Sequence, residues 1–110
     1  MEPIPDEALP PDETIAEATR LLDAGRPFAA HEVFEARWKA APEAERDLWQ
    51  GLAQLCVGIT HRLRGNAVGA SRLIDRGTDR LESYRASGEP TYGVDIDAWV
   101  ARAVATPSVR

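Results

Sequence analysis

A run of fourteen residues without a formal charge, from Leu48 to His61, most constrains what this chain can fold into. A helix on the surface of a globular protein normally carries a charged face, so a helix that lacks one is covered on most sides. The run is too short to span a bilayer, and Asp47 and Arg62 place a charge at each end of it. It therefore predicts the central helix of a soluble bundle.

Glycines and large apolar residues recur along this run at helical spacing. Gly51 and Gly58 lie seven residues apart on one face, where the absence of side chains allows a neighbouring helix to approach closely. A core stripe is expected from the apolar residues Leu48, Leu52, Leu55, Ile59 and Leu63.

Turn signals divide the remaining sequence into helices. Helices are predicted at about residues 12–25, 27–41, 43–64 and 67–86, followed by a loop at 87–95 and a short helix capped by Asp95. Gly65 and Asn66 form the strongest break, since glycine adopts the left-handed conformation and asparagine caps the helix that follows. We find no strand pattern. The prediction is an all-α, single-domain bundle of about five helices over residues 12–105, with a flexible leader at 1–11 and a tail at 106–110.

Composition narrows the function classes. Thirteen Lys and Arg residues against eighteen Asp and Glu residues give a net charge of −5, whereas a phosphate-binding surface normally needs a basic excess. Nucleic acid is therefore not expected as a partner, and neither is a membrane. The first residues are acidic and unlike a secretory signal, and a single cysteine, Cys56, forms no internal disulfide. We expect a cytoplasmic protein in which Cys56 is a small buried hydrophobe rather than a nucleophile.

A polar pair surrounded by aromatic residues is the one hint of chemistry. His31, Glu35 and Trp38 share a helix face because they lie four and three residues apart, and Phe28 and Phe34 flank them. We expect these aromatic residues in the core. Burying an imidazole and a carboxylate without hydrogen bonds costs several kcal/mol, roughly, so both groups need partners.

The central helix offers those partners. Gln54 and His61 lie on one of its faces, and short connections make neighbouring helices antiparallel, so the two helices can bring His31, Glu35, Gln54 and His61 together. Two imidazoles and a carboxylate suit a divalent metal such as zinc, with water as the fourth ligand. The hypothesis is that His31, Glu35 and His61 bind a metal, or that the cluster, with Trp38 and Gln54, binds a small polar ligand.

The alternative hypothesis is structural. Glu35 accepts the N–H of His31 one helical turn away, and Gln54 and His61 then complete a hydrogen-bond network that fixes helix packing. The protein is in that case a non-enzymatic interaction module, for which a homodimer is one arrangement. If the cluster were hydrolytic, Glu35 or a histidine would act as the base on a bound water. The spacing does not decide between these hypotheses.

Three segments together resemble a family of small helical proteins from bacteria and archaea, domain of unknown function 309 (DUF309). They are His31-x-x-x-Glu35-x-x-Trp38, Gly51-Leu52-x-Gln54 continuing to His61, and Gly65-Asn66-x-x-Gly69-Ala70. The resemblance covers about residues 28–81. It implies a helical fold and a functional HxxxExxW motif, proposed to bind metal, at His31, Glu35 and Trp38. It implies no particular reaction.

Overall fold

The computed structural model describes residues 8–108 and contains five α-helices, with no strand in that range. The helices are α1 (Pro11–Asp23), α2 (Pro27–Ala40), α3 (Arg46–Leu63), α4 (Ala67–Ser87) and α5 (Ile96–Ala105), and a 3₁₀ turn, η1 (Glu43–Glu45), precedes α3. The predicted all-α fold of five helices is confirmed. Residues 1–7 of the expected leader and 109–110 of the expected tail lie outside the described residues.

Two predicted helix caps are present. The Asn66 side chain accepts a hydrogen bond from the Gly69 N–H at 2.9 Å, and Asp95 accepts one from the Ala98 N–H at 3.0 Å. Gly65 has a φ of 77°, the left-handed conformation expected of a residue that ends a helix. The predicted third helix differs at its start, because residues 43–45 form a 3₁₀ turn, as is common at the N-termini of α-helices.

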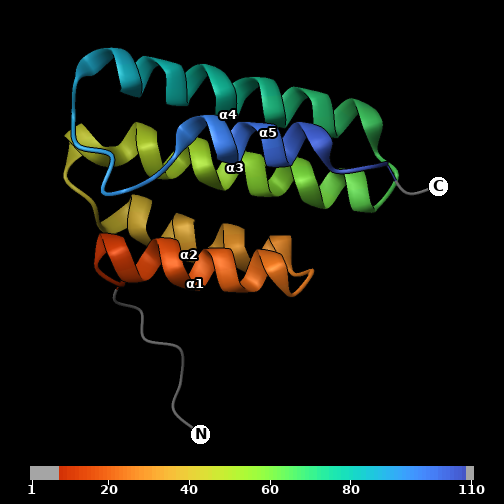
Figure 1. The fold of residues 1–110 in the computed structure, drawn as a ribbon, viewed down its shortest axis with the longest axis horizontal. Helices are drawn as coiled ribbons and strands as arrows, with labels where there is room; N and C mark the ends of the chain where they lie inside the picture. The colour runs from red at the N-terminus through yellow and green to blue at the C-terminus, as the bar shows by residue number, and fades with distance from the viewer. Residues whose placement is uncertain (1–7, 109–110) are drawn as a thin grey trace, which may run out of the picture.

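The helices form layers with α3 in the middle (Figure 1). The antiparallel pair α1 and α2 lies on one side of α3, α4 lies on the other, and α5 lies in front of α3. Ten of the eighteen residues of α3 are buried. Within residues 8–108, no helix is long and apolar enough to cross a membrane. The prediction that the uncharged run forms the central helix is confirmed.

Helices α3 and α4 approach closely through glycines. A Cβ atom built on Gly51 would lie 2.7 Å from Leu81 Cγ, and one on Gly58 would lie 2.7 Å from Ile74 Cγ1. On the facing helix, a Cβ on Gly77 would lie 2.8 Å from the backbone oxygen of Gly51. Such distances leave no room for a side chain, so the glycines set how near the two helices pack.

Two residues expected in the core are exposed instead. Leu63 is 39% exposed and Phe28 is 47% exposed, whereas Phe34 is fully buried. Leu63 is the last residue of α3 and Phe28 lies in the first turn of α2. Both side chains stand at helix ends, where the neighbouring helices no longer cover them.

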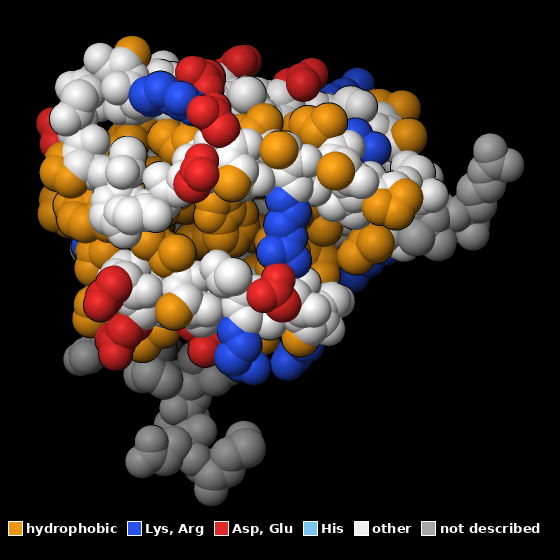
Figure 2. Space-filling view, viewed as in Figure 1, with side chains coloured by type: hydrophobic (Ala, Val, Ile, Leu, Met, Phe, Trp, Pro, Cys, Tyr) orange, Lys and Arg blue, Asp and Glu red, His pale blue; other side chains and the backbone are white. Residues whose placement is uncertain are grey.

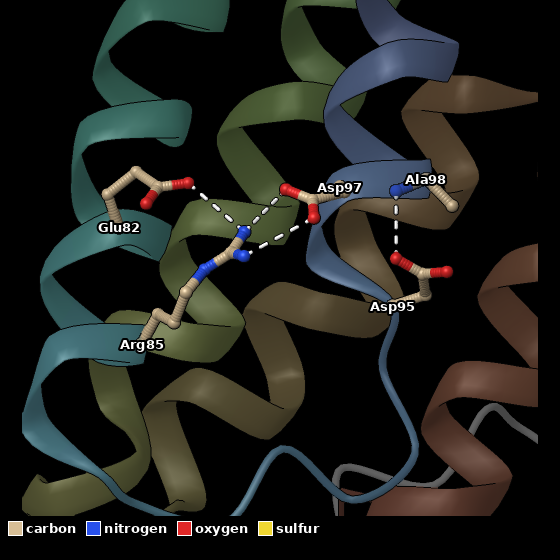
Figure 3. A network of polar contacts seen from close by, with 5 residues as sticks. All are labelled: Glu82, Arg85, Asp95, Asp97 and Ala98. Atoms are coloured by element: carbon tan, nitrogen blue, oxygen red, sulfur yellow. Dashed lines mark hydrogen bonds and ion pairs between the residues drawn. The ribbon is translucent and has the colours of Figure 1, made fainter.

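Polar contacts tie α5 to the helices around it. Arg85 of α4 pairs with Asp97 at 2.6 Å and with Glu82 at 3.1 Å, as Figure 3 shows, and Arg102 of α5 pairs with Asp23 of α1 at 2.7 Å. Apolar side chains are visible in the hollow between α5 and the α1–α2 pair (Figure 2). The charged contacts therefore position a helix that leaves part of the apolar interior uncovered on this face.

A second polar network joins α2 to the start of α3. Glu45 accepts from Arg37 at 2.7 Å and from the Trp49 indole N–H at 3.0 Å. Burial alone would raise the pKa of Glu45, but hydrogen bonds from Arg37, Trp49 and Tyr92 outweigh it and lower the pKa below its ordinary value. Tyr92, whose φ is 53°, stacks on Trp49 with ring centroids 6.0 Å apart. The network holds the loop before α5 against the core.

Replacing Gly77 with alanine tests the close approach of α3 and α4. Helix propensity alone predicts that Gly77→Ala stabilises by about 1 kcal/mol. The contact with the Gly51 backbone predicts the opposite sign, a loss of about 1–3 kcal/mol in the free energy of unfolding, measured by urea denaturation. Ser71→Ala, at an exposed position of the same helix, is the control for propensity. A Gly77→Ala variant more stable than the parent would contradict the proposed packing.

Removing the Glu45 carboxylate tests the second network. Glu45→Ala leaves the Arg37 guanidinium and the Trp49 N–H without their acceptor, so we expect a loss of about 1–3 kcal/mol in unfolding free energy at pH 7. Because the pKa of Glu45 is lowered in the folded state, the stabilisation is fully present above the ordinary value of 4.5 and is lost as the pH falls further through the folded-state value. The difference in unfolding free energy between parent and variant should therefore become smaller as the pH is lowered. Glu43→Ala, at an exposed position of the same turn, should change stability little at any pH.

Candidate functional site

Three polar residues of α2 form a ladder at intervals of four residues. The Nε2 atom of His31 lies 2.9 Å from Glu35 Oε2, and the Nζ atom of Lys39 lies 2.8 Å from Glu35 Oε1. The side chains are 16% exposed for His31, 34% for Glu35 and 66% for Lys39. The expected pairing of His31 with Glu35 is present, but the ladder runs from a mostly buried imidazole to an exposed ammonium group and is not a buried charged cluster.

The Glu35 carboxylate lies between the imidazole of His31 and the ammonium group of Lys39, which favour its ionised form. The hydrogen bond from Lys39 lowers the pKa of Glu35 below its ordinary value, partial burial acts in the opposite direction, and the charges of Lys39 and His31 add to the lowering. A carboxylate whose pKa is lowered is a weak base. Glu35 is therefore better suited to accept hydrogen bonds than to remove a proton.

The His31 ring is held by packing on one side and by Glu35 on the other. The centroids of the His31 and Phe28 rings lie 4.9 Å apart. Nδ1, the other ring nitrogen, is buried and has no hydrogen-bond partner among the described residues. A buried polar atom without a partner carries a desolvation cost of about 1–3 kcal/mol.

A pocket of about 210 Å³ lies between α2 and α3 beside this ladder. Its polar lining consists of His31, Glu35, Gln50 and Gln54, and Trp38 lines it as well. The apolar part of the lining is Ala53, Val57 and Leu73. The pocket thus joins the three residues of the HxxxExxW motif to the expected ligand-binding residue Gln54.

An arginine from α4 orients Gln54. Arg80 Nε donates to Gln54 Oε1 at 3.3 Å, and Arg80 Nη1 pairs with Asp47 at 2.9 Å. Because the amide oxygen of Gln54 is engaged, its NH₂ group remains as a donor for a molecule in the pocket.

His61 does not join this arrangement. It does not line the pocket, and its Nδ1 atom lies 3.2 Å from Asn66 Nδ2 in the turn between α3 and α4. Within residues 8–108, no group of three or more His, Cys, Asp or Glu side chains is placed to hold a metal ion. The metal site expected from His31, Glu35 and His61 is therefore not assembled. The reason is that His61 lies one turn beyond Val57, in the last turn of α3, where Asn66 is its neighbour.

Several residues around the pocket were not predicted from the sequence. Lys39 follows Glu35 by four residues, and this spacing is a signal that the sequence contains. Leu73 and Arg80 come from α4, and only the packing of α4 on α3 brings them near.

Cys56 plays no part in the site. It is fully buried, and this burial raises the pKa of its thiol to about 12. A thiol that is neither accessible nor ionised is not a nucleophile, so the expectation of a small buried hydrophobe is confirmed.

Comparisons with known proteins place these residues in a family. A 48-residue stretch is 42% identical to the uncharacterised protein YpuF of Bacillus subtilis (strain 168), covering 43% of this chain and 28% of that protein. The chain thus spans little more than a quarter of this relative's length. No solved structure matches the chain. The profile of DUF309, described as a domain of unknown function, matches residues 15–73, which include the HxxxExxW motif and all of α3. Because this match covers more than half of the chain, the protein belongs to the DUF309 family.

Proposed function

We propose that the pocket between α2 and α3 binds a small, uncharged polar molecule. The observation that carries the proposal is that His31, Glu35, Trp38 and Gln54, which belong to two helices, line one pocket. Binding sites combine apolar walls with a few convergent polar groups, and this pocket has both.

The volume limits the size of the ligand. Pockets for drug-sized molecules usually have roughly 300–1,000 Å³, so about 210 Å³ suits a molecule of only a few heavy atoms.

The charges around the pocket favour a neutral ligand. The Glu35 carboxylate is already paired with Lys39 and His31, and Arg80 is paired with Asp47. A further full charge would lack an opposite charge. The NH₂ group of Gln54 can donate to a neutral polar group, and the amide of Gln50 can both donate to it and accept from it. A primary amide or a small polyol has the required chemistry.

Binding of a small neutral molecule is favoured over metal binding and over catalysis. His31 and Glu35 supply two ligands, whereas protein zinc sites use three or four, and Lys39 already occupies one oxygen of Glu35. The donor set therefore does not fit zinc. The lowered pKa of Glu35 disfavours a role as a general base.

A purely structural role is supported less well. A network that fixes α2 against α3 needs hydrogen bonds between the two helices. Within residues 8–108, the hydrogen-bond partners of Glu35 are His31 and Lys39, both on α2, and no hydrogen bond joins His31 or Glu35 to α3. The ladder is thus poorly placed to set helix register.

Titration of ¹⁵N-labelled protein with acetamide and with glycerol, followed by NMR, tests the proposal. We expect saturable shifts at millimolar concentrations in the indole N–H of Trp38 and the side-chain amides of Gln50 and Gln54. The Gln54→Leu variant, which lacks the amide, should lose them. His61→Ala removes the other histidine, which lies outside the pocket, and should leave them unchanged.

Three outcomes would contradict the proposal: no saturable shift with either compound, equal shifts at the Trp49 and Trp99 indoles, or shifts that persist in Gln54→Leu. A saturable response to Zn²⁺ that disappears in Glu35→Gln would favour the metal hypothesis instead.

A further inference from the structure

A second and larger pocket lies at the opposite end of α2 from Lys39. It has a volume of about 380 Å³ and forms where the turn between α1 and α2 meets the last turn of α3. Both segments lie toward the right in Figure 1. None of its lining residues lines the pocket of the HxxxExxW motif, so the two pockets are separate.

Two arginines line this pocket without a carboxylate partner. Arg26 and Arg64 are exposed, and neither forms an ion pair within residues 8–108. Among the eleven arginines of residues 8–108, five pair with carboxylates and six, including Arg26 and Arg64, do not; these two differ from the other four in lining a common pocket. Arg26 also stands at the N-cap of α2, where the helix dipole disfavours a positive charge. An anion in the pocket would relieve this unfavourable placement.

The net charge of the lining favours a ligand with one negative charge. Glu32 is the acidic residue that lines the pocket beside the two arginines. With Arg26 and Arg64 each contributing one positive charge, the lining carries a net charge of +1. A monoanion matches that charge, whereas a phosphate dianion or a polyanion exceeds it.

Apolar surface accompanies the positive charge. Phe28 and Leu63 line the pocket and are 47% and 39% exposed, and both are among the few large apolar residues left exposed in the described chain. The buried Pro27 and the half-buried Ala29 complete the apolar lining. Exposed apolar side chains that gather beside a concave charged site favour a ligand with an apolar body.

We propose that this pocket binds a small amphiphilic carboxylate. Its carboxylate lies between the guanidinium groups of Arg26 and Arg64, which match a carboxylate in charge and in hydrogen-bond geometry. Its hydrocarbon part packs on Phe28 and Leu63. The volume of about 380 Å³ accommodates a short aliphatic chain or one aromatic ring.

Titration of the ¹⁵N-labelled full chain with octanoate tests this proposal, with octanol and acetate as matched probes. Octanol lacks the charge and acetate lacks the hydrocarbon chain. We expect saturable octanoate shifts in the backbone amides of residues 26, 28, 29 and 63–65, and much weaker binding of either matched probe.

Charge-removing variants identify the anion-binding groups. Arg26→Gln and Arg64→Gln should each weaken octanoate binding about two- to fivefold, the range for an exposed ion pair. Arg72→Gln and Arg76→Gln, at exposed positions of α4 outside the pocket, should leave the dissociation constant unchanged. All four positions are exposed, so the fold should persist.

The proposal is overturned if octanoate gives no saturable shift, if octanol binds as tightly as octanoate, if the variants at positions 26 and 64 bind like the controls, or if the shifts centre elsewhere. Because the two pockets share no lining residue, these results do not depend on whether the HxxxExxW pocket binds a ligand.

Discussion

The close contact between α3 and α4 determines how the other helices can be arranged. Gly51 and Gly58 present backbone to α4, and Gly77 presents backbone in return. One face of α3 is thereby covered by α4, whose Leu81 and Ile74 side chains lie against the two glycines of α3. The other faces of α3 remain available for α2 and α5, and the fully buried Phe34 of α2 packs on Trp49 of α3 with ring centroids 6.3 Å apart. A helix without charges is stable in this position because neighbours surround it.

This arrangement also explains where the pockets lie. Helices α2 and α3 are held together by apolar packing around Phe34 and by the Glu45 network at one end. Elsewhere along the same interface, smaller and polar residues of α3 such as Ala53 and Gln54 face His31 and Glu35, and a pocket remains. At the other end of this interface, the other helices do not cover Phe28 and Leu63, and both residues line the second pocket.

Local signals in the sequence predicted the helices and the central position of α3. The caps at Asn66 and Asp95 and the break at Gly65 depend on neighbouring residues only, and they are where they were expected. The site was predicted in part, because the i, i+4 pairing of His31 with Glu35 is also local. Which turn of α3 faces His31 depends on how the helices slide and rotate against each other. Sequence spacing alone does not determine this. In the structure, His61 pairs with Asn66 rather than with His31.

A binding role for the HxxxExxW pocket implies that its residues are held for binding rather than for stability. Functional residues often lower the stability of the empty protein. His31 has one buried nitrogen without a partner, and its bond to Glu35 stays within α2. The direct measurement is the free energy of unfolding of His31→Phe, obtained by urea denaturation beside the parent. We expect a variant at least as stable as the parent, because phenylalanine keeps the packing on Phe28 and removes the unpartnered nitrogen. A loss of more than about 1 kcal/mol would contradict a binding role and favour a structural one.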